Sequence, residues 1–532
     1  MAASTITMKM LLIIPNQTTT QNLDTFASKK KTLKLWCMSS SVTAATACFS
    51  PSLQLQRQHA PPRRSGNYGP SLWDYDYIQS LNTQYAEERY LKRVSELKVE
   101  VKKMLVQLEK ELPIVEELLE LVDELQRVGI SYHFEDEINQ ILASVYDHKY
   151  AKGKNNCEGK ERDLYSTALE FRLLRQHGFT VSQEIFDCFR NDKGDFDPNL
   201  GSDTKGEFAT DFLQKNFDEN IDDENLALMV CHALELPIHW RVERPNARWF
   251  IEAYEKRADV KSVVLELAKL DFNIVQATHQ QELKHIYEWW KQTGLAEKLP
   301  FARDRIVECY FWAVGFLVHP QYGYARTITA KGVALVLVID DIFDVYGTPE
   351  ELQLFNNALQ RACMQEAEWY LGGYAPILEE YMNNAWISSS VPVVLFHAYF
   401  LVTNPTEEEA VRSLYKYHGI IQFSAMIFRL ANDLATSPDE MKRGDVPKLL
   451  ECYMNESGGS REEAIEYARI VMDETWKKMN QEAFIATHSP FPQHLVRIAF
   501  DVGRMAQYMY QHGTLSPQIN HSIAASLFLL VE

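Results

Sequence analysis

From about residue 80 onward, almost every segment of this 532-residue chain repeats its apolar side chains with the period of a helix. Leu118, Val122 and Leu125, for example, recur at i, i+4 and i+7, and Gly129 follows them where a helix cap is expected. Stripes with the two-residue period of a half-buried strand are nearly absent. The periodicity therefore predicts an all-α fold.

Three long segments carry this period most clearly, over 261–295 (as one or two helices), 461–485 and 492–512. The apolar run Val333–Ile339 has the composition of a short buried strand, but its neighbours are helical, so we interpret it as a buried helix. Residues 191–206 are rich in Asp, Gly and Asn, which predicts a loop.

The first 62 residues differ in composition from the rest. Residues 1–50 hold 15 Ser or Thr residues and one acid, Asp24, together with a basic run at 29–31. This composition is typical of an organelle transit peptide, with a secretory signal around Met10–Ile14 as the alternative. That apolar run is too short to span a bilayer, and no later segment reaches the roughly 18 uninterrupted apolar residues of a membrane helix. We therefore expect no membrane association.

The overall charge is acidic, with 73 Asp and Glu against 54 Lys and Arg. A net charge of −19 argues against a nucleic-acid partner, which requires a basic face. The eight cysteines are scattered without a CxxC pair, which indicates neither a zinc site nor a disulfide framework and favours a reducing compartment. The length allows two or three domains of roughly 150–200 residues, and a boundary is expected near Pro300.

One acidic motif, Asp340-Asp341-Ile342-Phe343-Asp344, directly follows a strongly apolar run. On a helix, Asp340 and Asp344 stand at i and i+4 on one face, where carboxylates can share a hard cation such as Mg²⁺. A solvated helix end is the alternative. The position beside a buried segment favours a metal site, because several unpaired carboxylates there would repel one another without a cation.

A second polar stripe places Asn432, Thr436 and Glu440 at i, i+4 and i+8, as three oxygen ligands on one helix face. An ordinary wet helix face is the alternative. Pro438 is expected to end or kink this helix. Arg429 lies three residues before Asn432, and a base beside metal ligands suits an anion such as diphosphate.

Other bases occur near the acidic motifs. Arg303 and Arg305 flank Asp304 at the start of the helix that leads to the first motif, and Lys448 follows the second. A surface salt bridge and an ordinary surface lysine are the alternatives. Together with bound cations, these bases would form a positive pocket inside an acidic protein.

Aromatic residues are the third ingredient of the candidate site. An apolar, dry pocket with aromatic faces stabilises a carbocation by roughly 0.5–2 kcal/mol per ring. Trp312, Tyr346 and Tyr510 are candidates for such a pocket, and core packing is the alternative for each. Other chemistries fit less well, because the chain has no HExxH, GxSxG or strand-linked GxGxxG motif.

With these motifs, the chain resembles the plant terpene synthases of the angiosperm monoterpene class. Arg63-Arg64, followed after eight residues by Trp73, matches the RRx8W motif of that class. DDIFDVYGT (340–348) and ANDLATSPDE (431–440) match its two metal motifs, and FARDRIVE, HALELPIHWR and KRGDVPK read as further family segments. The likeness runs from residue 63 to near the C-terminus.

The resemblance implies a chloroplast enzyme of two helical domains behind a transit peptide at 1–62. Residues 63–299 would form a vestigial α-barrel domain, and residues 300–532 a class I terpenoid synthase fold. The implied substrate is geranyl diphosphate with Mg²⁺ or Mn²⁺, acted on by a monomer. Diphosphate leaves, the allylic cation rearranges, and proton loss or water capture ends the reaction.

By matching position, the resemblance also assigns roles to single residues. The metal ions would be held by Asp340, Asp341, Asp344, Asn432, Thr436 and Glu440. The substrate, through its diphosphate and metals, would meet Arg303, Arg305, Asp340, Asp344, Arg429, Asn432 and Lys448. Catalysis would involve Trp312 and Tyr510 in the cation pocket and Arg63, Arg64 and Trp73 as a cap over the site.

The chain departs from the family pattern in its spacing. Asp340 and Asn432 are 92 positions apart, whereas the family has about fifty more, or roughly three helices with their loops. The break follows 356–364, and a smaller gap follows 202–206. Val391 stands before Pro392 where the family usually has Gly.

Three hypotheses follow. The first is a monoterpene synthase of the ionising type. The second is an impaired or inactive relative from a deleted or mis-spliced transcript, since the missing helices would leave apolar faces in water at about 25 cal/mol per Å². The third is a prenyl-elongating enzyme, which normally carries two aspartate-rich motifs, so Asn432, Thr436 and Glu440 argue against it.

Overall fold

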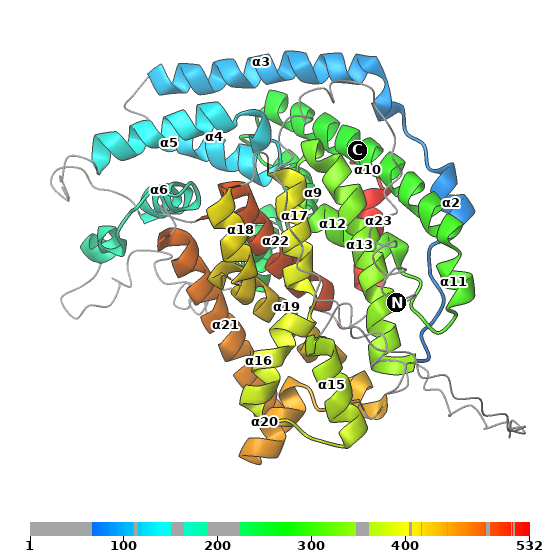
Figure 1. Ribbon diagram of the computed structural model, residues 1–532. Helices are drawn as coiled ribbons and strands as arrows, with labels where there is room; N and C mark the ends of the chain where they lie inside the picture. Colours follow the sequence, from blue (N-terminus) through cyan, green and yellow to red (C-terminus); the bar gives the residue numbers. More distant parts are fainter. Residues whose placement is uncertain are drawn as a thin grey trace, which may run out of the picture.

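The computed structural model describes residues 66–110, 115–150, 164–189, 224–346, 361–403, 407–416, 418–443, 445–485, 490–511, 513 and 517–531. Within these ranges every regular element is a helix (Figure 1), so the all-α prediction is confirmed. The predicted loop at 191–206 lies outside the described residues.

The helices of the N-terminal half are α2 (Tyr75–Ser80), α3 (Glu88–Lys110), α4 (Val115–Arg127), α5 (Glu135–Lys149), α6 (Leu164–Gln176), α8 (Glu224–Glu235), α9 (Glu243–Glu255), α10 (Ser262–Thr293) and α11 (Leu295–Lys298). Those of the C-terminal half are α12 (Ile306–Phe316), α13 (Gly323–Asp341), α15 (Arg361–Gly372), α16 (Leu378–Ser388), α17 (Val391–Val402), α18 (Glu408–Tyr415), α19 (Gly419–Arg443), α20 (Leu449–Ser457), α21 (Arg461–Ile485), α22 (Gln493–Tyr510) and α23 (Pro517–Leu527). Short helical turns join them, namely η1 (Gln84–Ala86), η2 (Ser131–His133), η3 (Gln183–Phe189), η4 (Ile238–Trp240), η5 (Pro320–Tyr322) and the π-helical η6 (Ile342–Tyr346).

The three long predicted helices are confirmed as α10, α21 and α22. Their ends follow the capping signals in the sequence. Gly294 ends α10 at a φ of 62°, and Gly129 takes a φ of 79° just after α4, a conformation that glycine adopts without a steric penalty.

Helix α10 contributes side chains to two hydrophobic cores. Its first half, with Leu267, packs against α3, α4 and α9, whereas its second half, with Leu283 and Ile286, packs against α12, α13, α22 and α23. Figure 1 shows α10 running between α3 on one side and α12 and α13 on the other. The two halves of the chain therefore share this helix, and the division at residue 299/300 stays a prediction.

The C-terminal half is a bundle arranged around α19. This helix packs against α16, α17, α20, α21 and α22, and its buried residues include Ile420, Ile427 and Leu430. Helices α15, α16 and α20 gather at one end of the bundle, away from α3, α4 and α5 (Figure 1). That end carries the polar clusters described below.

The run Val333–Ile339 is helical, as predicted, but it is not fully buried. Within it, Ala334 and Val338 are buried, and the other side chains of the run are only partly buried. Helix α13 packs on α10, α12 and α17, and in the described ranges its remaining side stays partly open to water. Phe400 of the neighbouring α17 is 51% exposed, which is unusual for so large an apolar side chain.

In the part of the chain that the structure describes, one stretch, Leu378–Val402, has the length and mean hydropathy of a membrane-crossing helix. Half of its most apolar window is buried inside the protein, as in the core helices of many proteins that cross no membrane. A break at Ser390 divides it into α16 and α17. The stretch is therefore weak evidence for a membrane span.

Ser390 occupies a strained backbone position at that break. Its φ of 62° is left-handed, and its side chain makes no capping hydrogen bond to α17. Ser390→Gly is expected to raise the free energy of unfolding by about 1 kcal/mol, because glycine removes the steric cost of this conformation. Urea unfolding monitored by circular dichroism measures the change.

Ser389→Gly is the matched control. Ser389 has a φ of −58° and its hydroxyl accepts from the Val391 backbone N–H, so glycine there is expected to lower stability. Equal effects of the two substitutions would contradict the strain at Ser390.

Candidate active site

The first acidic motif lies where α13 ends. Asp340 and Asp341 form the last turn of α13, and Asp344 lies in the π-helical turn η6. The uninterrupted α-helical spacing expected for Asp340 and Asp344 is therefore wrong, because the backbone widens into a π turn between them. Such turns occur frequently at functional sites, where they re-aim side chains.

Arg303 fixes the geometry of this motif. Its backbone N–H donates to Asp341 Oδ2 (2.7 Å) and its Nε to Asp341 Oδ1 (2.8 Å), while Nη2 donates to Asp340 Oδ2 (2.7 Å). Burial opposes the charge of Arg303, but the two carboxylates raise its pKa. Asp341 is fully buried with both oxygens bonded to Arg303, so it anchors this arginine. Its predicted role as a direct metal ligand stays a prediction.

Arg305 is directed elsewhere. Its guanidinium donates to the backbone carbonyls of Asp304 and Gly69, both at 2.8 Å. The structure thus brings Arg305 to the N-terminal segment and gives it no contact with the other predicted diphosphate bases. Its role as a substrate contact stays a prediction.

Trp73 lies on the same N-terminal segment. Its ring packs edge-on against Phe528 at 5.3 Å, and its carbonyl accepts from the Tyr287 hydroxyl (2.8 Å). The segment that follows the RRx8W arginines is therefore held against α10 and the chain after α23. Arg63 and Arg64 themselves lie outside the described residues.

The second polar stripe lies on α19. This helix continues through Pro438 to Arg443, so of the two expected outcomes, an end or a kink, the end is wrong. Pro438 is exposed, and the packing of α19 against α20 and α21 outweighs one lost backbone hydrogen bond. Glu440 therefore stays on the same helix as Asn432 and Thr436, whose hydroxyl donates to the Asn432 carbonyl (2.9 Å).

Charges couple the two acidic elements across the site. The Asp344 side chain is exposed to water on one side, and protein groups surround it on the others. Burial, followed by repulsion from Asp340 and Glu366, raises its pKa to about 8, against the opposing effect of Lys448 and Arg429. Since Lys448 precedes α20 and Arg429 lies on α19, the end of α13 faces these two helices.

The residues present fit a divalent cation. Glu440 Oε2 is buried without a hydrogen-bond partner, and burial raises the pKa of Glu440. A bound cation would supply the partner that this buried oxygen lacks. Within the described ranges no three His, Cys, Asp or Glu side chains already stand at metal-binding spacing. The predicted ligands come instead from two sides of the site and include an amide and a hydroxyl.

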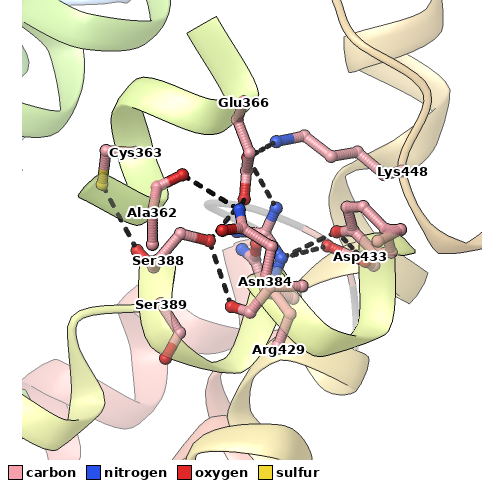
Figure 2. Close-up of polar contacts among 12 residues, drawn as sticks. Ala362, Cys363, Glu366, Asn384, Ser388, Ser389, Arg429, Asp433 and Lys448 are labelled. Carbon is pink, nitrogen blue, oxygen red and sulfur yellow. Dashed lines mark hydrogen bonds and ion pairs between the residues drawn. The ribbon is translucent and has the colours of Figure 1, made fainter. Parts of the chain in front are cut away.

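A buried ionic cluster lies beside these ligands (Figure 2). Glu366 of α15 accepts from Lys448 Nζ (2.7 Å) and from Arg429 Nη2 (3.3 Å), both to Oε2. Burial opposes its ionisation, but Lys448 and Arg429 outweigh that effect and lower the pKa of Glu366 to about 2. Glu366 was not a candidate from the sequence. It belongs to no motif, and it directly follows the break in the family spacing after 356–364.

Asp433 completes this cluster on the other side of Arg429. Its Oδ1 lies 3.0 Å from Arg429 Nε, and its Oδ2 accepts from the hydroxyl of Tyr381 (2.6 Å) and from the Leu449 N–H (3.3 Å). Arg429 Nε also donates to the Tyr381 oxygen (2.8 Å). Asp433 and Tyr381 thus fix Arg429 relative to α16 and α20, and neither was a candidate from the sequence.

Three aromatic rings form a wall next to the candidate metal ligands. Trp312 lies 5.4 Å from Phe428 and 6.0 Å from Tyr510, which is itself 6.0 Å from Phe428. The Tyr510 phenol contacts Asn432, and burial raises its pKa to about 12. The structure therefore brings Trp312 and Tyr510 together as expected and adds Phe428. Tyr346 stacks on Phe301 instead, with centroids 3.7 Å apart.

Comparison with protein-family models accounts for both halves of the chain. The terpene synthase N-terminal domain matches residues 72–210. The metal-binding domain of the terpene synthase family matches residues 291–363 and 358–478, in two segments that meet near the start of α15. The two acidic motifs fall in different segments of that match.

Individual proteins resemble the chain over most of its length. Terpineol synthase, chloroplastic, of Nicotiana langsdorffii is 47% identical over 510 aligned positions, which cover 85% of this chain and 95% of that protein. A crystal structure of limonene synthase with 2-fluorolinalyl diphosphate superposes with a TM-score of 0.83 at 42% identity, covering 88% of this chain and 100% of that one. Isoprene synthase from grey poplar (Populus x canescens), with three Mg²⁺ ions and dimethylallyl-S-thiolodiphosphate, has a TM-score of 0.76 at 34% identity and covers 87% and 99%.

The alignment also supports the shortened spacing. Its 510 positions exceed the residues in 85% of a 532-residue chain, so the relative carries residues without a counterpart here. The likeness nevertheless spans both halves, includes both acidic motifs, and extends to the fold. This chain belongs to the terpene synthase family.

Proposed function

We propose that the protein converts geranyl diphosphate into a monoterpene in the plastid, by metal-dependent ionisation of the allylic diphosphate. The observation that carries this proposal is the convergence of two acidic elements, a basic cluster and an aromatic wall at one end of the helical bundle. The relatives named for terpineol and limonene synthesis support the reaction class. The name of the Nicotiana enzyme as chloroplastic supports the compartment.

In the proposed mechanism, the bases recognise the diphosphate. Arg303, Arg429 and Lys448 approach from three different segments and can contact separate oxygens of the two phosphates. Mg²⁺ ions bound by Asp340, Asp344, Asn432, Thr436 and Glu440 would neutralise the developing negative charge of the leaving diphosphate. Arg303 orients Asp340 for that purpose, since it binds one of the two carboxylate oxygens and leaves the other.

The aromatic wall acts on the other fragment. Once the C–O bond breaks, the electron pair stays on the diphosphate and the positive charge stays on the allylic carbons. The faces of Trp312, Phe428 and Tyr510 stabilise that charge without supplying a nucleophile. Proton loss from a neighbouring carbon, or capture of water, then gives the neutral product.

The direct test is incubation of the purified protein with geranyl diphosphate and Mg²⁺, followed by gas chromatography of the volatiles. Monoterpenes formed only with the metal support the proposal. Absence of product from a folded protein would indicate the inactive relative. Longer prenyl diphosphates, formed when isopentenyl diphosphate is added, would indicate an elongating enzyme.

Phe428→Ala tests the aromatic wall. Loss of one ring face is expected to lower kcat about three- to thirtyfold and to change the ratio of products, because the cation loses roughly 0.5–2 kcal/mol of stabilisation. Product analysis and steady-state kinetics measure both effects. Phe400→Ala, on the exposed face of α17, is the control and should leave the product ratio unchanged. An unchanged product ratio in Phe428→Ala would exclude this ring from the pocket.

A further inference from the structure

Glu366 stands between the two bases to which the diphosphate is assigned. In Figure 2 its carboxylate lies between Lys448 and Arg429, and one oxygen accepts from both. The side chain is 5% exposed, and Lys448 is 6% exposed. The carboxylate of Glu366 is therefore already paired with Arg429 and Lys448 when no substrate is bound.

The charges of this cluster are balanced. Arg429 and Lys448 carry two positive charges, and Glu366 and Asp433 carry two negative ones. A diphosphate that approaches these bases therefore meets no net positive charge from the four groups. The charge of the bases stays offset for the substrate unless one of the acids gives up its contacts.

Asp433 is the less suited of the two to release its partner. It stands four residues after Arg429 on α19, and its other contacts, to the Tyr381 hydroxyl and the Leu449 N–H, fix it in place. Glu366 comes from a different helix, α15, and touches both bases through a single oxygen. Of these two acids, Glu366 is therefore the one that competes for Arg429 and Lys448 together.

Glu366 also has donors that remain when the bases move. The hydroxyl of Ser388 donates to its Oε1, and the amide of Asn384 lies 3.4 Å from the same oxygen. A buried carboxylate that lost every partner would be strongly destabilised. These two neutral donors reduce that cost, because they stay on Glu366 while Arg429 and Lys448 change partner.

We propose that Glu366 is a positioning residue that holds Arg429 and Lys448 in the ligand-free protein and yields them to the diphosphate when substrate and metal bind. The assignment rests on the proposed function, since it requires these bases to bind a diphosphate. It gives Glu366 the place of an internal counter-anion. The affinity for substrate then depends on how much more strongly the two bases bind the diphosphate than they bind this carboxylate.

Pyrophosphate binding in the presence of Mg²⁺, measured by isothermal titration calorimetry, tests this assignment. Glu366→Gln removes the competing charge and keeps the shape of the side chain. It is expected to bind pyrophosphate about tenfold or more tightly than the original protein, because two charge-assisted contacts no longer compete. The KM for geranyl diphosphate is expected to fall in the same direction. Glu368→Gln, on the exposed side of α15, should bind like the original protein.

The possible outcomes distinguish failure of the proposed function from failure of the counter-anion role. If the original protein binds no pyrophosphate with Mg²⁺, the proposed function fails. If it binds, but Glu366→Gln binds equally or more weakly, only the counter-anion role is overturned. A residue that merely supports the fold would lower the melting temperature without strengthening pyrophosphate binding.

A second variant covers the case in which Glu366→Gln does not fold. Glu366→Asp keeps the buried charge but withdraws it by one methylene from the bases. Pyrophosphate affinity is expected to rise severalfold in this variant. Unchanged or weaker binding by a folded Glu366→Asp would overturn the assignment.

Discussion

Replacing Asp340 with alanine is expected to lower kcat for geranyl diphosphate by at least about 10²–10³-fold. Asp340 is the acid of the first motif that both contacts Arg303 (2.7 Å) and acts on the charge of Asp344. Its removal takes away a proposed metal ligand and one of the two carboxylates that hold Arg303. Single-turnover kinetics at saturating Mg²⁺ measure the loss at the chemical step.

Asp473→Ala provides the matched control for that experiment. Asp473 lies on α21 and pairs with Lys477 at 2.7 Å on the surface of the bundle. Turnover of this variant should equal that of the original protein. If Asp340→Ala keeps normal turnover while its melting curve shows it to be folded, the first motif does not bind the catalytic metal.

Replacing Arg429 with leucine is expected to have the largest effect on stability, a loss of about 3–5 kcal/mol. The guanidinium bonds Tyr381 and pairs with two buried acids, Glu366 and Asp433. Without Arg429 both carboxylates lose a compensating charge in a site shielded from water. Urea unfolding, followed by circular dichroism, measures the difference.

Arg469→Leu is the control for this loss. The Arg469 side chain is 66% exposed on α21, and it pairs with Glu466 at 3.9 Å. A surface pair of this kind is worth about 0–1 kcal/mol, so little change is expected. A similar small loss in Arg429→Leu would show that the cluster around Glu366 does not hold α15, α16, α19 and α20 together.

The long helices were predictable from the sequence because local signals determine them. Helix α10 combines a sustained apolar stripe with a glycine that caps it in the left-handed conformation. The second polar stripe could also be predicted, since one helix places Asn432, Thr436 and Glu440 on one face. In each case the information lies within a few turns of chain.

Other features depend on packing between distant segments, which periodicity does not report. Glu366 reaches Lys448 across 82 positions, and Tyr381 reaches Asp433 across 52. Phe428 carried no signal that separates a pocket residue from the rest of the core. The continuation of α19 through Pro438 is likewise a tertiary effect, because packing outweighs a local preference.

Helix α13 is less covered than its composition predicts. A run as apolar as Val333–Ile339 is expected to be covered on all sides, yet much of it is only partly buried. Further along the chain, the match to the metal-binding domain divides into two segments at 358–363, and an aligned relative carries residues without a counterpart in this chain. The divided match and the longer relative support the hypothesis of an internal deletion.

The central claim is that the acidic end of α13 and the polar face of α19 hold divalent ions between them, next to the bases of the diphosphate site. A crystal structure of the protein with Mn²⁺ and pyrophosphate tests it most directly, because the anomalous signal locates the ions. We expect ions bound between Asp340 and Asp344 on one side and Asn432 and Glu440 on the other. Ions bound elsewhere, or two motifs whose side chains point apart, would contradict the account.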